Sequence, residues 1–591
     1  MQYDDILRRI GGFGKYQKRL MSVLVLSQLP VACQFIAQVF FAAKTDHWCV
    51  VPEEHALNCS GLQLDSLREC QEAQKNQSIP YRLDGDGNRI YSSCERYATT
   101  DDKDPGSGWD LNATDVIPCD AGWEFDRSRY QLTIIEDFSL VCARADYPGI
   151  AQSFWFVGVL LGSLGWGSVG DWFGRRKTFI LSFLLTTVSA ISLAFSPNFA
   201  AFVILTVTVT ASAYGAFLML FVLTSEIVGP KRRVFVGTMF NLFFGVGYML
   251  LTLIAFLLRD WRHLQLAISL QFVLCFPLLF VLPESPRWLM SKNRFTDAIV
   301  VLRKISHING SSVGDTTFES SERKPVVGQQ RQSTTQLDLV RTPNIRKITL
   351  IMWYDWFVAN MVYYGLSLST SALGIDDYLA ALVSGAVEIP SLILCVYLME
   401  RVGRRLTLVA FYISGGLACL VTIFLPLGAW RAGVAMVGKF AIAAAFNHIY
   451  VYACELYPTV IRTMGVGSSS MVARVSGILC PIILLLGKHW EPLPLFVFGA
   501  GSVIAGVLSS MLPETLGRNL PNTIQEGENF RASSGFPSCC KSAPLRQDGD
   551  SAHPPAHYDL LPTKPSSAGP PAGGVSPQPT GNDFPTVSMQ T

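Results

Sequence analysis

Long apolar stretches alternate with short polar turns along most of the chain. A helix needs about 20 mainly apolar residues to cross a bilayer, and about twelve stretches reach that length. They lie near residues 20–43, 149–170, 178–196, 200–224, 234–258, 263–282, 348–372, 377–399, 407–427, 432–454, 465–487 and 493–513. The pattern predicts an all-α membrane protein with twelve transmembrane helices.

Polar segments divide this pattern into parts. They are an N-terminal segment (1–19), a first six-helix bundle (20–282) that includes a large loop (44–148), a second loop (283–347), a second six-helix bundle (348–513) and a tail (514–591). No small-residue cleavage site follows the first apolar stretch, so that stretch is expected to remain as a helix. An amphipathic helix is expected near 295–308, and the Pro-, Ser- and Gly-rich tail is expected to be disordered from about residue 525.

Basic residues indicate the orientation in the membrane. The turns GRRK, GPKRR, RVGRR and IRT follow the second, fourth, eighth and tenth stretches, whereas loop 44–148 carries about twice as many acidic as basic residues. Short cytoplasmic loops are typically enriched in Lys and Arg. Both termini and loop 283–347 are therefore expected in the cytoplasm, and loop 44–148 outside the cell.

Loop 44–148 has the composition of an extracellular domain. An even set of six cysteines predicts three disulfides with open connectivity, formed by Cys49, Cys59, Cys70, Cys94, Cys119 and Cys142. The same loop contains three sequons, which predict glycosylation at Asn58, Asn76 and Asn112. A fourth sequon, at Asn309, lies in the loop expected to be cytoplasmic, where it would not be glycosylated.

The two bundles contain matching motifs. Pairs of similar residues lie 229, 229 and 230 positions apart, namely Asp171 with Glu400, Glu226 with Glu455, and Pro283 with Pro513. A constant offset is the mark of a duplication. Two parallel six-helix repeats with a substrate site between them near the membrane midplane are typical of major facilitator transporters.

The repeated turns combine acidic and basic residues. Such residues can pair across the cytoplasmic face in one conformation and separate in another, which predicts a cytoplasmic gate. Its candidates are Asp171, Arg175, Arg176, Glu226, Arg232, Arg233, Glu400, Arg404, Arg405, Glu455 and Arg462. Any single arginine among them is equally explained as a topology signal that faces lipid headgroups.

Four charged residues fall inside apolar stretches. Arg474 lies deepest, and because a charge near the bilayer centre costs about 2.5–3.5 kcal/mol, it is expected to face a cavity. Asp355 either contacts a substrate or caps a helix end, and Glu388, just before Pro390, either caps freed amides or moves in gating. Lys439 is expected to extend toward the membrane surface.

Aromatic residues accompany these charges. Tyr363, Tyr364, Phe446 and Tyr450 lie on helices that line the central space in this architecture. Each alone is more often a packing residue, but together they provide walls for ring stacking and for contacts with cations.

Several longer motifs carry a resemblance to a known family. They are YDDILRRIGGFGKYQ, CDAGWEFDRSRYQLTIIEDFSLVC, GDWFGRRK, PESPRWLM and CELYPTVIRTMGVG. On these motifs the chain, from Tyr3 to Pro521, resembles the organic cation, organic anion and carnitine transporters of the major facilitator superfamily. The resemblance implies a polyspecific plasma-membrane transporter of small organic ions, with a possible coupling or exchange ion.

Three positions bear on the substrate class. The resemblance implies that organic cation transporters place acids where this chain has Asn447 and Arg474, and that organic anion transporters add a lysine where it has Leu392. One arginine without these partners looks most like the carnitine and zwitterion branch, where Arg474 would hold a carboxylate. Organic anion exchange, and a non-transporting receptor that uses the glycosylated loop, stay open as alternatives.

The composition argues against other classes. Half of the 591 residues are hydrophobic and 16% are charged, and the net charge of +2 gives no excess of basic residues for nucleic acid. The eight histidines include no metal-binding spacing, and no nucleophile or base cluster is visible, so neither an enzyme nor a cofactor or metal site is expected.

Overall fold

Helices make up most of the protein. The computed structural model describes residues 3–51, 72–73, 75–76, 78–83, 89–98, 116–229, 232–311, 335–518 and 520–530. The main helices are α2 (Lys15–Leu26), α3 (Gln28–Ile36), α4 (Gln38–Phe41), α7 (Tyr147–Phe173), α8 (Arg175–Ala194), α9 (Phe199–Ile227), α10 (Arg233–Leu257), α11 (Trp261–Leu274), α12 (Leu278–Val281), α17 (Pro343–Leu368), α18 (Asp377–Arg401), α19 (Arg404–Thr422), α20 (Ala429–Leu456), α21 (Arg462–Leu486) and α22 (Leu493–Ser509).

Ten helical segments in the described part of the chain are long and apolar enough to cross a membrane. Helices α2 to α4 together form the first of them, and α11 with α12 forms another. The two further predicted spans correspond to α17, which carries Asp355 and Asn360, and to the 17-residue α22. Each of the twelve predicted stretches therefore coincides with a helix or a run of helices, and the all-α fold is confirmed.

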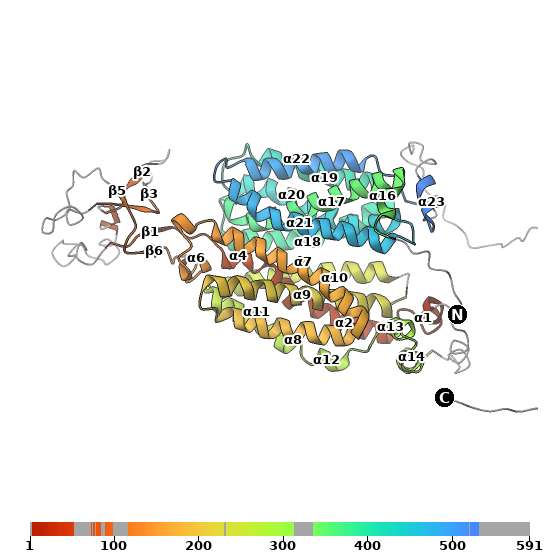
Figure 1. The fold of residues 1–591 in the computed structure, drawn as a ribbon. Coiled ribbons are helices and arrows are strands. Elements are labelled where there is room, and N and C mark those ends of the chain that lie inside the picture. Colours follow the sequence, from red (N-terminus) through yellow and green to blue (C-terminus); the bar gives the residue numbers. More distant parts are fainter. Residues whose placement is uncertain are drawn as a thin grey trace, which may run out of the picture. The chain divides into compact units, whose positions relative to one another are not determined.

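The helices form two halves that contact each other through equivalent elements (Figure 1). In the N-terminal half, residues 15–281, α9 packs against α7 and α8; in the C-terminal half, residues 343–509, α19 packs against α20 and α22. Between the halves, α7 packs against α21 and α10 against α18. Because the sequence offset of 229 relates α7 to α18 and α10 to α21, these two contacts are equivalent under the repeat.

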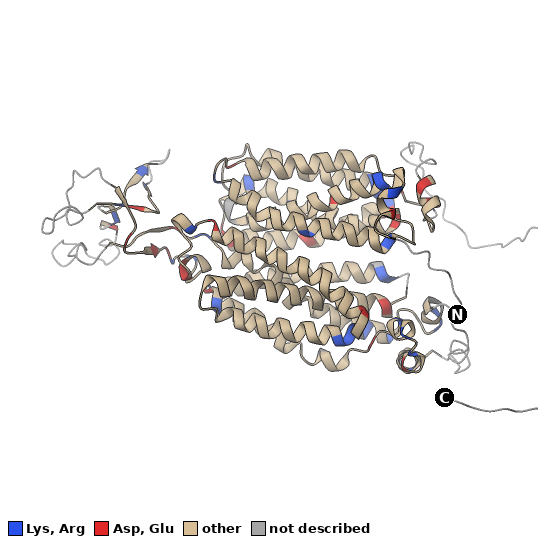
Figure 2. Cartoon of the chain, viewed as in Figure 1, with Lys and Arg blue, Asp and Glu red and all other residues tan. Residues whose placement is uncertain are grey.

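The two ends of the helical bundle differ in charge. Lys, Arg, Asp and Glu gather at one end, which we call the charged end, and the middle of the bundle carries few of them (Figure 2). Helix α8 starts at the charged end with Arg175, and α19 starts there with Arg404. The opposite end, where loop 44–148 leads into α7, is called the loop end.

Loop 44–148 contains three antiparallel strand pairs. They are β1 (His47–Cys49) with β6 (Trp123–Phe125), β2 (Tyr81–Leu83) with β3 (Arg89–Tyr91), and β4 (Glu95–Tyr97) with β5 (Val116–Pro118). Disulfides join Cys49 to Cys119 and Cys94 to Cys142, which settles two connectivities that the spacing left open. The predicted residues Cys59, Cys70, Asn58 and Asn112 lie outside the described residues. The side chain of Asn76 accepts hydrogen bonds from Arg89 and Tyr91, and its glycosylation stays a prediction.

Short helices cover the charged end. The predicted amphipathic helix is α14 (Phe295–Asn309), which follows α13 (Pro286–Ser291) and packs against α2. The Asn309 amide is occupied by the N-terminal segment, because its nitrogen donates to Ile10 O at 2.9 Å and its oxygen accepts from Tyr16 N at 2.9 Å. The absence of a glycan at Asn309 stays a prediction.

The start of the tail is ordered for longer than its composition predicts. Helix α23 (Ile524–Asn529) places Glu528 at the start of α17, where its carboxylate accepts from Asn344 N at 2.9 Å and Ile345 N at 3.2 Å. Disorder from residue 525 is therefore wrong for residues 525–529, because one carboxylate caps a neighbouring helix. The rest of the predicted disorder, residues 531–591, lies outside the described residues.

Candidate functional site

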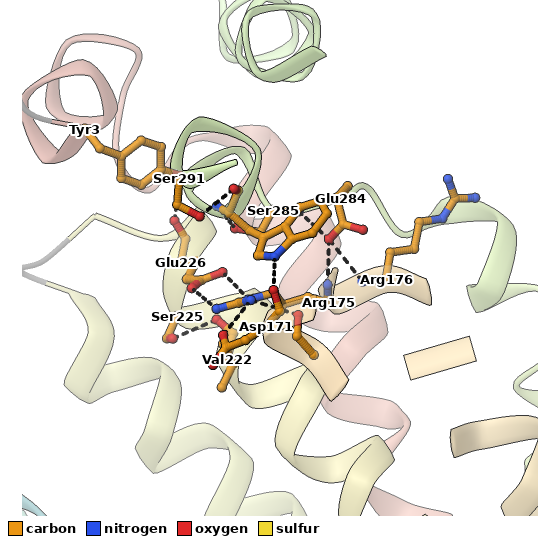
Figure 3. Close-up of polar contacts among 12 residues, drawn as sticks. Tyr3, Asp171, Arg175, Arg176, Val222, Ser225, Glu226, Glu284, Ser285 and Ser291 are labelled. Carbon is orange, nitrogen blue, oxygen red and sulfur yellow. Dashed lines mark hydrogen bonds and ion pairs between the residues drawn. The ribbon is translucent and has the colours of Figure 1, made fainter. Parts of the chain in front are cut away.

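A cluster of charged residues lies at the charged end of the N-terminal half (Figure 3). Arg175 pairs with Glu226 at 3.3 Å and with Asp171 at 3.0 Å, which joins α7, α8 and α9. Glu284 accepts from the backbone nitrogens of Arg175 at 2.8 Å and of Arg176 at 3.1 Å. A carboxylate at this place satisfies the first amides of α8 and interacts favourably with its dipole.

The C-terminal half repeats this cluster. Arg404 pairs with Glu455 at 3.1 Å, and Glu514 accepts from Arg404 N at 2.8 Å and Arg405 N at 3.0 Å. Glu455 also accepts from the hydroxyl of Thr515 at 2.5 Å. The duplication inferred from the sequence therefore extends to the hydrogen bonds.

Each cluster depends on a glycine in a left-handed conformation. Gly174 has φ 99° and Gly403 has φ 108°. A Cβ atom would lie 2.5 Å from Glu284 Oε2 at the first position and 2.8 Å from Glu514 Oε2 at the second. Only glycine allows the turn and the close carboxylate together. Glu284 and Glu514 were missed in the sequence, although the repeat of PES as PET marks both of them.

The other predicted gate residues have local partners or are exposed. Arg176 donates to Leu279 O, Arg233 to Ser225 O and Arg462 to Tyr457 O, at 3.5, 3.0 and 3.3 Å. Arg232 and Glu400 are exposed. All the ion pairs of Arg175, Glu226, Arg404 and Glu455 in the described residues lie within one half, so none of them joins the halves in this structure.

Arg474 lies between the two halves. It is in the middle of α21, and its Nη2 donates to the hydroxyl of Tyr214 on α9 at 3.1 Å, across the interface. The guanidinium also lies 5.0 Å from the centre of the Tyr214 ring. Arg474 is 7% exposed, and its Nε has no hydrogen-bond partner. No carboxylate in the described part of the chain pairs with it.

A second charged group lies on α18 and α20. Glu388 Oε1 accepts from the Tyr363 hydroxyl at 2.6 Å and lies 3.5 Å from Lys439 Nζ. The Lys439 ammonium sits 3.4 Å from the centre of the Tyr363 ring, and its side chain is 1% exposed. Lys439 therefore does not extend to the membrane surface, as the sequence suggested, because Glu388 and Tyr363 hold it inside the C-terminal half.

The predicted aromatic residues meet in one chain of ring contacts. Tyr363 is stacked with Phe446 at 5.6 Å between centroids, Phe446 contacts the edge of Tyr450 at 5.6 Å, and Tyr364 contacts Tyr363 at 5.1 Å. Asn447 lies next to them and accepts from Asn241 on α10 at 2.7 Å. The rings thus connect the surroundings of Glu388 with the interface between the halves.

Asp355 lies apart from these groups. It is fully buried, its Oδ2 accepts from Ser509 on α22 at 2.9 Å, and its backbone oxygen accepts from Tyr412 on α19 at 2.7 Å. The structure therefore places it within the packing of the C-terminal half, while the other candidate substrate residues gather near α20 and α21.

A narrow hollow lies beside Tyr364. Aromatic side chains and two amides line it, namely Phe35, Gln38, Gln152, Trp155, Phe156 and Tyr364. These residues come from both halves, and the Oε1 atom of Gln38 is buried without a hydrogen-bond partner. The hollow is therefore largely apolar, and a few polar groups reach it.

Comparisons with known proteins agree with this architecture. Residues 130–525 match the family model described as "Sugar (and other) transporter". Among solved structures, the proton:xylose symporter XylE bound to 6-bromo-6-deoxy-D-glucose is 18% identical with a TM-score of 0.51, over 64% of this chain and 88% of that chain. The inward open conformation of the xylose transporter XylE from E. coli is 16% identical with a TM-score of 0.51, over 65% of this chain and 89% of that chain. At these identities the likeness shows the fold.

Curated relatives match over nearly the whole chain. The organic cation transporter protein of Drosophila melanogaster is 36% identical over 90% of this chain and 95% of its own length. The human organic cation/carnitine transporter 2 is 36% identical over 89% of this chain and 93% of its own length. The beta-alanine transporter of Drosophila melanogaster is 35% identical over 91% of this chain and 91% of its own length. The chain therefore belongs to the organic cation and carnitine transporter family of the major facilitator superfamily.

Proposed function

We propose that this protein is a polyspecific plasma-membrane transporter that moves small organic ions by alternating access. Relatives at 35–36% identity are named for organic cations, carnitine and beta-alanine. Carnitine and beta-alanine each carry a carboxylate and a cationic nitrogen, so both are zwitterions at neutral pH. We propose the same class of substrate here, with both termini of the chain in the cytoplasm.

The observation that carries the proposal is the unpaired guanidinium of Arg474. A buried arginine without a carboxylate costs free energy, and a substrate carboxylate would supply the missing charge. The guanidinium already spans the two halves through Tyr214, at 3.1 Å. A carboxylate bound here would therefore contact both halves, which is where a transporter with two repeats holds its substrate.

The opposite end of a zwitterion has a matching environment. Glu388 offers a carboxylate, and the rings of Tyr363 and Phe446 offer faces to which a cation is attracted. In this structure the ammonium of Lys439 occupies this place, 3.4 Å from the centre of the Tyr363 ring, so a substrate cation would have to share Glu388 with it or displace it. Asn447, Tyr364 and Tyr450 complete the proposed wall. Asp355 is not part of it.

The charged clusters are proposed to form the cytoplasmic gate. Each cluster fastens the ends of its own helices, so the two halves can move as units while Arg175 and Arg404 keep their partners. The exposed carboxylates of Asp171 and Glu400 remain able to meet basic residues of the opposite half in another conformation. In this structure the two clusters do not pair with each other.

Uptake of labelled substrates into proteoliposomes tests the role of Arg474. We expect Arg474→Ala and Arg474→Lys to raise KM for carnitine and beta-alanine by tenfold or more, and to change KM for tetraethylammonium, which lacks a carboxylate, by much less. Arg294→Ala is the matched control, because Arg294 is exposed and pairs with Asp297 on the surface. Equal KM values for carboxylate substrates in wild type and both variants would contradict the proposal.

Organic anion exchange is the second candidate, because an unpaired Arg474 suits any organic carboxylate. It predicts uptake of para-aminohippurate that is stimulated by internal dicarboxylates, with no preference for substrates that also carry a cation. A receptor without transport predicts binding of a protein to loop 44–148 and no flux of any of these ions.

A further inference from the structure

The segment that closes loop 44–148 belongs mechanically to the N-terminal half. We call residues 129–137 the stalk. Gln131 N donates to Arg259 O at 3.0 Å, and Trp261 N donates to Leu132 O at 3.1 Å. Asp137 pairs with Arg262 at 2.8 Å and accepts from Trp261 Nε1 at 3.0 Å. The stalk is thus fastened to the loop-end turn before α11, and it must move together with that half.

The stalk also touches the first residues of α18, in the other half. The hydroxyl of Tyr130 donates to Asp377 Oδ2 at 3.1 Å, and Arg129 lies 4.0 Å from the same oxygen. Tyr130 is 5% exposed and Asp377 is 8% exposed. Burial, followed by the charge of Asp377, raises the pKa of the Tyr130 phenol, so this group keeps its proton and acts as a donor.

Ring contacts surround this hydrogen bond. Tyr378 is stacked with Phe40 of α4 at 5.8 Å, and its ring also contacts Tyr130 at 5.5 Å and Phe256 of α10 at 5.5 Å. Tyr378 therefore inserts between three rings of the N-terminal half. At the rim, Lys488 of the C-terminal half pairs with Asp146, just before α7.

The contacts between the halves are distributed unevenly along the bundle. The polar contacts of Tyr130 and Lys488 lie at the loop end, and those of Arg474 and Asn447 lie near the middle. At the charged end, the ion pairs of Arg175 and Arg404 stay within their own halves. Such a distribution is expected when the halves are closed at the loop end and apart at the charged end.

We propose that Tyr130 and Asp377 form a gate at the loop end, with Tyr378 as its apolar seal, and that this gate is closed in the structure. It must open before a substrate can reach Tyr364 and Arg474 from the loop side. The stalk couples loop 44–148 to the movement, since the disulfide of Cys142 to Cys94 fixes the loop to the chain just after the stalk.

Crosslinking tests whether the gate must open. We expect a short bis-methanethiosulfonate reagent, which joins each thiol through a disulfide and releases sulfinate, to link the cysteines of the double variant Tyr130→Cys/Asp377→Cys. The link is expected to reduce uptake at least tenfold until a reductant cleaves it. The matched control is Asp137→Cys/Arg262→Cys, a pair that is also at the loop end but within one half. Its crosslink is expected to leave uptake within twofold of the uncrosslinked protein. Unimpaired uptake by the crosslinked gate pair, or failure of that pair to crosslink, would overturn the proposal.

A second measurement does not depend on transport. Gln38 lines the hollow beside Tyr364 and is 5% exposed, so a cysteine in its place reports access from the loop end. Removing one hydrogen bond with Tyr130→Phe is expected to raise the labelling rate of Gln38→Cys by a small reagent roughly fivefold in purified protein. An unchanged rate would overturn the gate even if the proposed substrates are transported. A raised rate would support it even if they are not.

Discussion

Glu284 and Glu514 perform the same task in the two halves. Each carboxylate accepts the first backbone amides of a helix, those of Arg175 and Arg176 in one half and those of Arg404 and Arg405 in the other. Each also lies against a glycine with positive φ. The geometry that the two halves share therefore depends on a carboxylate, a glycine turn and the start of a helix, more than on the arginine side chains.

This relationship predicts a stability loss when either carboxylate is neutralised. Glu284→Gln and Glu514→Gln are each expected to lower the free energy of unfolding by about 1–2 kcal/mol, since charge-assisted bonds to helix amides are lost. Thermal unfolding in detergent measures the effect. Glu491→Gln is the control, because Glu491 pairs with Arg431 at the surface and is 74% exposed. Equal melting temperatures in all three variants would show that the caps contribute nothing.

The buried pair of Lys439 and Glu388 predicts a non-additive result. Lys439→Met alone is expected to destabilise the protein by about 3–5 kcal/mol, because it leaves a buried carboxylate without its cation. The double variant Lys439→Met/Glu388→Gln is expected to recover much of that loss. A double-mutant cycle by thermal unfolding measures the coupling. Simple addition of the two single effects would mean that the side chains do not interact.

The position of Asp355 predicts that its charge is not needed for substrate binding. Asparagine can still accept a hydrogen bond from Ser509. Asp355→Asn is therefore expected to change KM for carnitine by no more than about twofold, which is less than the effect of losing one hydrogen bond. Glu388→Gln, measured in the same uptake assay, is expected to raise KM clearly. A large rise in KM for Asp355→Asn would place Asp355 in the binding site after all.

Asp120 predicts acid sensitivity of the extracellular loop. A hydrogen bond from the buried Arg96 lowers the pKa of the Asp120 carboxyl from 3.8 to about 2. Because the folded-state pKa is the lower one, the pair stabilises the loop above about pH 4. That stabilisation is lost as the pH falls from about 4 to about 2.

Limited proteolysis of the loop between pH 5 and pH 2, with an acid-active protease, measures this loss. Wild type is expected to become more susceptible across the window. Asp120→Asn is expected to be more susceptible already at pH 5, and to show a smaller further change. Parallel curves for the two proteins would contradict the role of the ion pair.

The sequence predicted the parts of this protein that repeat or that depend on hydropathy. The helices that match the twelve stretches follow from apolar length. The duplicated Glu226 and Glu455 pair with Arg175 and Arg404, which lie in the earlier basic turns GRRK and RVGRR. The ring contacts of Tyr363 and Phe446 also join residues that the sequence predicts to line the central space.

Other features depend on contacts between distant segments. The partner of Lys439 is 51 positions away on another helix, so hydropathy suggested a surface position instead. Tyr130 was part of a family motif, but nothing in its neighbourhood indicated that it meets Asp377, 247 positions later. Glu528 orders part of the tail through the start of α17, which composition alone cannot reveal.

The N-terminal segment has a consequence for how the protein is handled. Gly229 N donates to Gly12 O at 2.8 Å, and the Tyr3 hydroxyl donates to Glu226 O at 2.7 Å. The N-terminal residues thus hold the turn after α9, next to Glu226, which pairs with Arg175. A shortened version that begins after Gly14, or a bulky fusion tag placed directly before Tyr3, would disturb this turn. An expression tag is therefore best kept away from Tyr3.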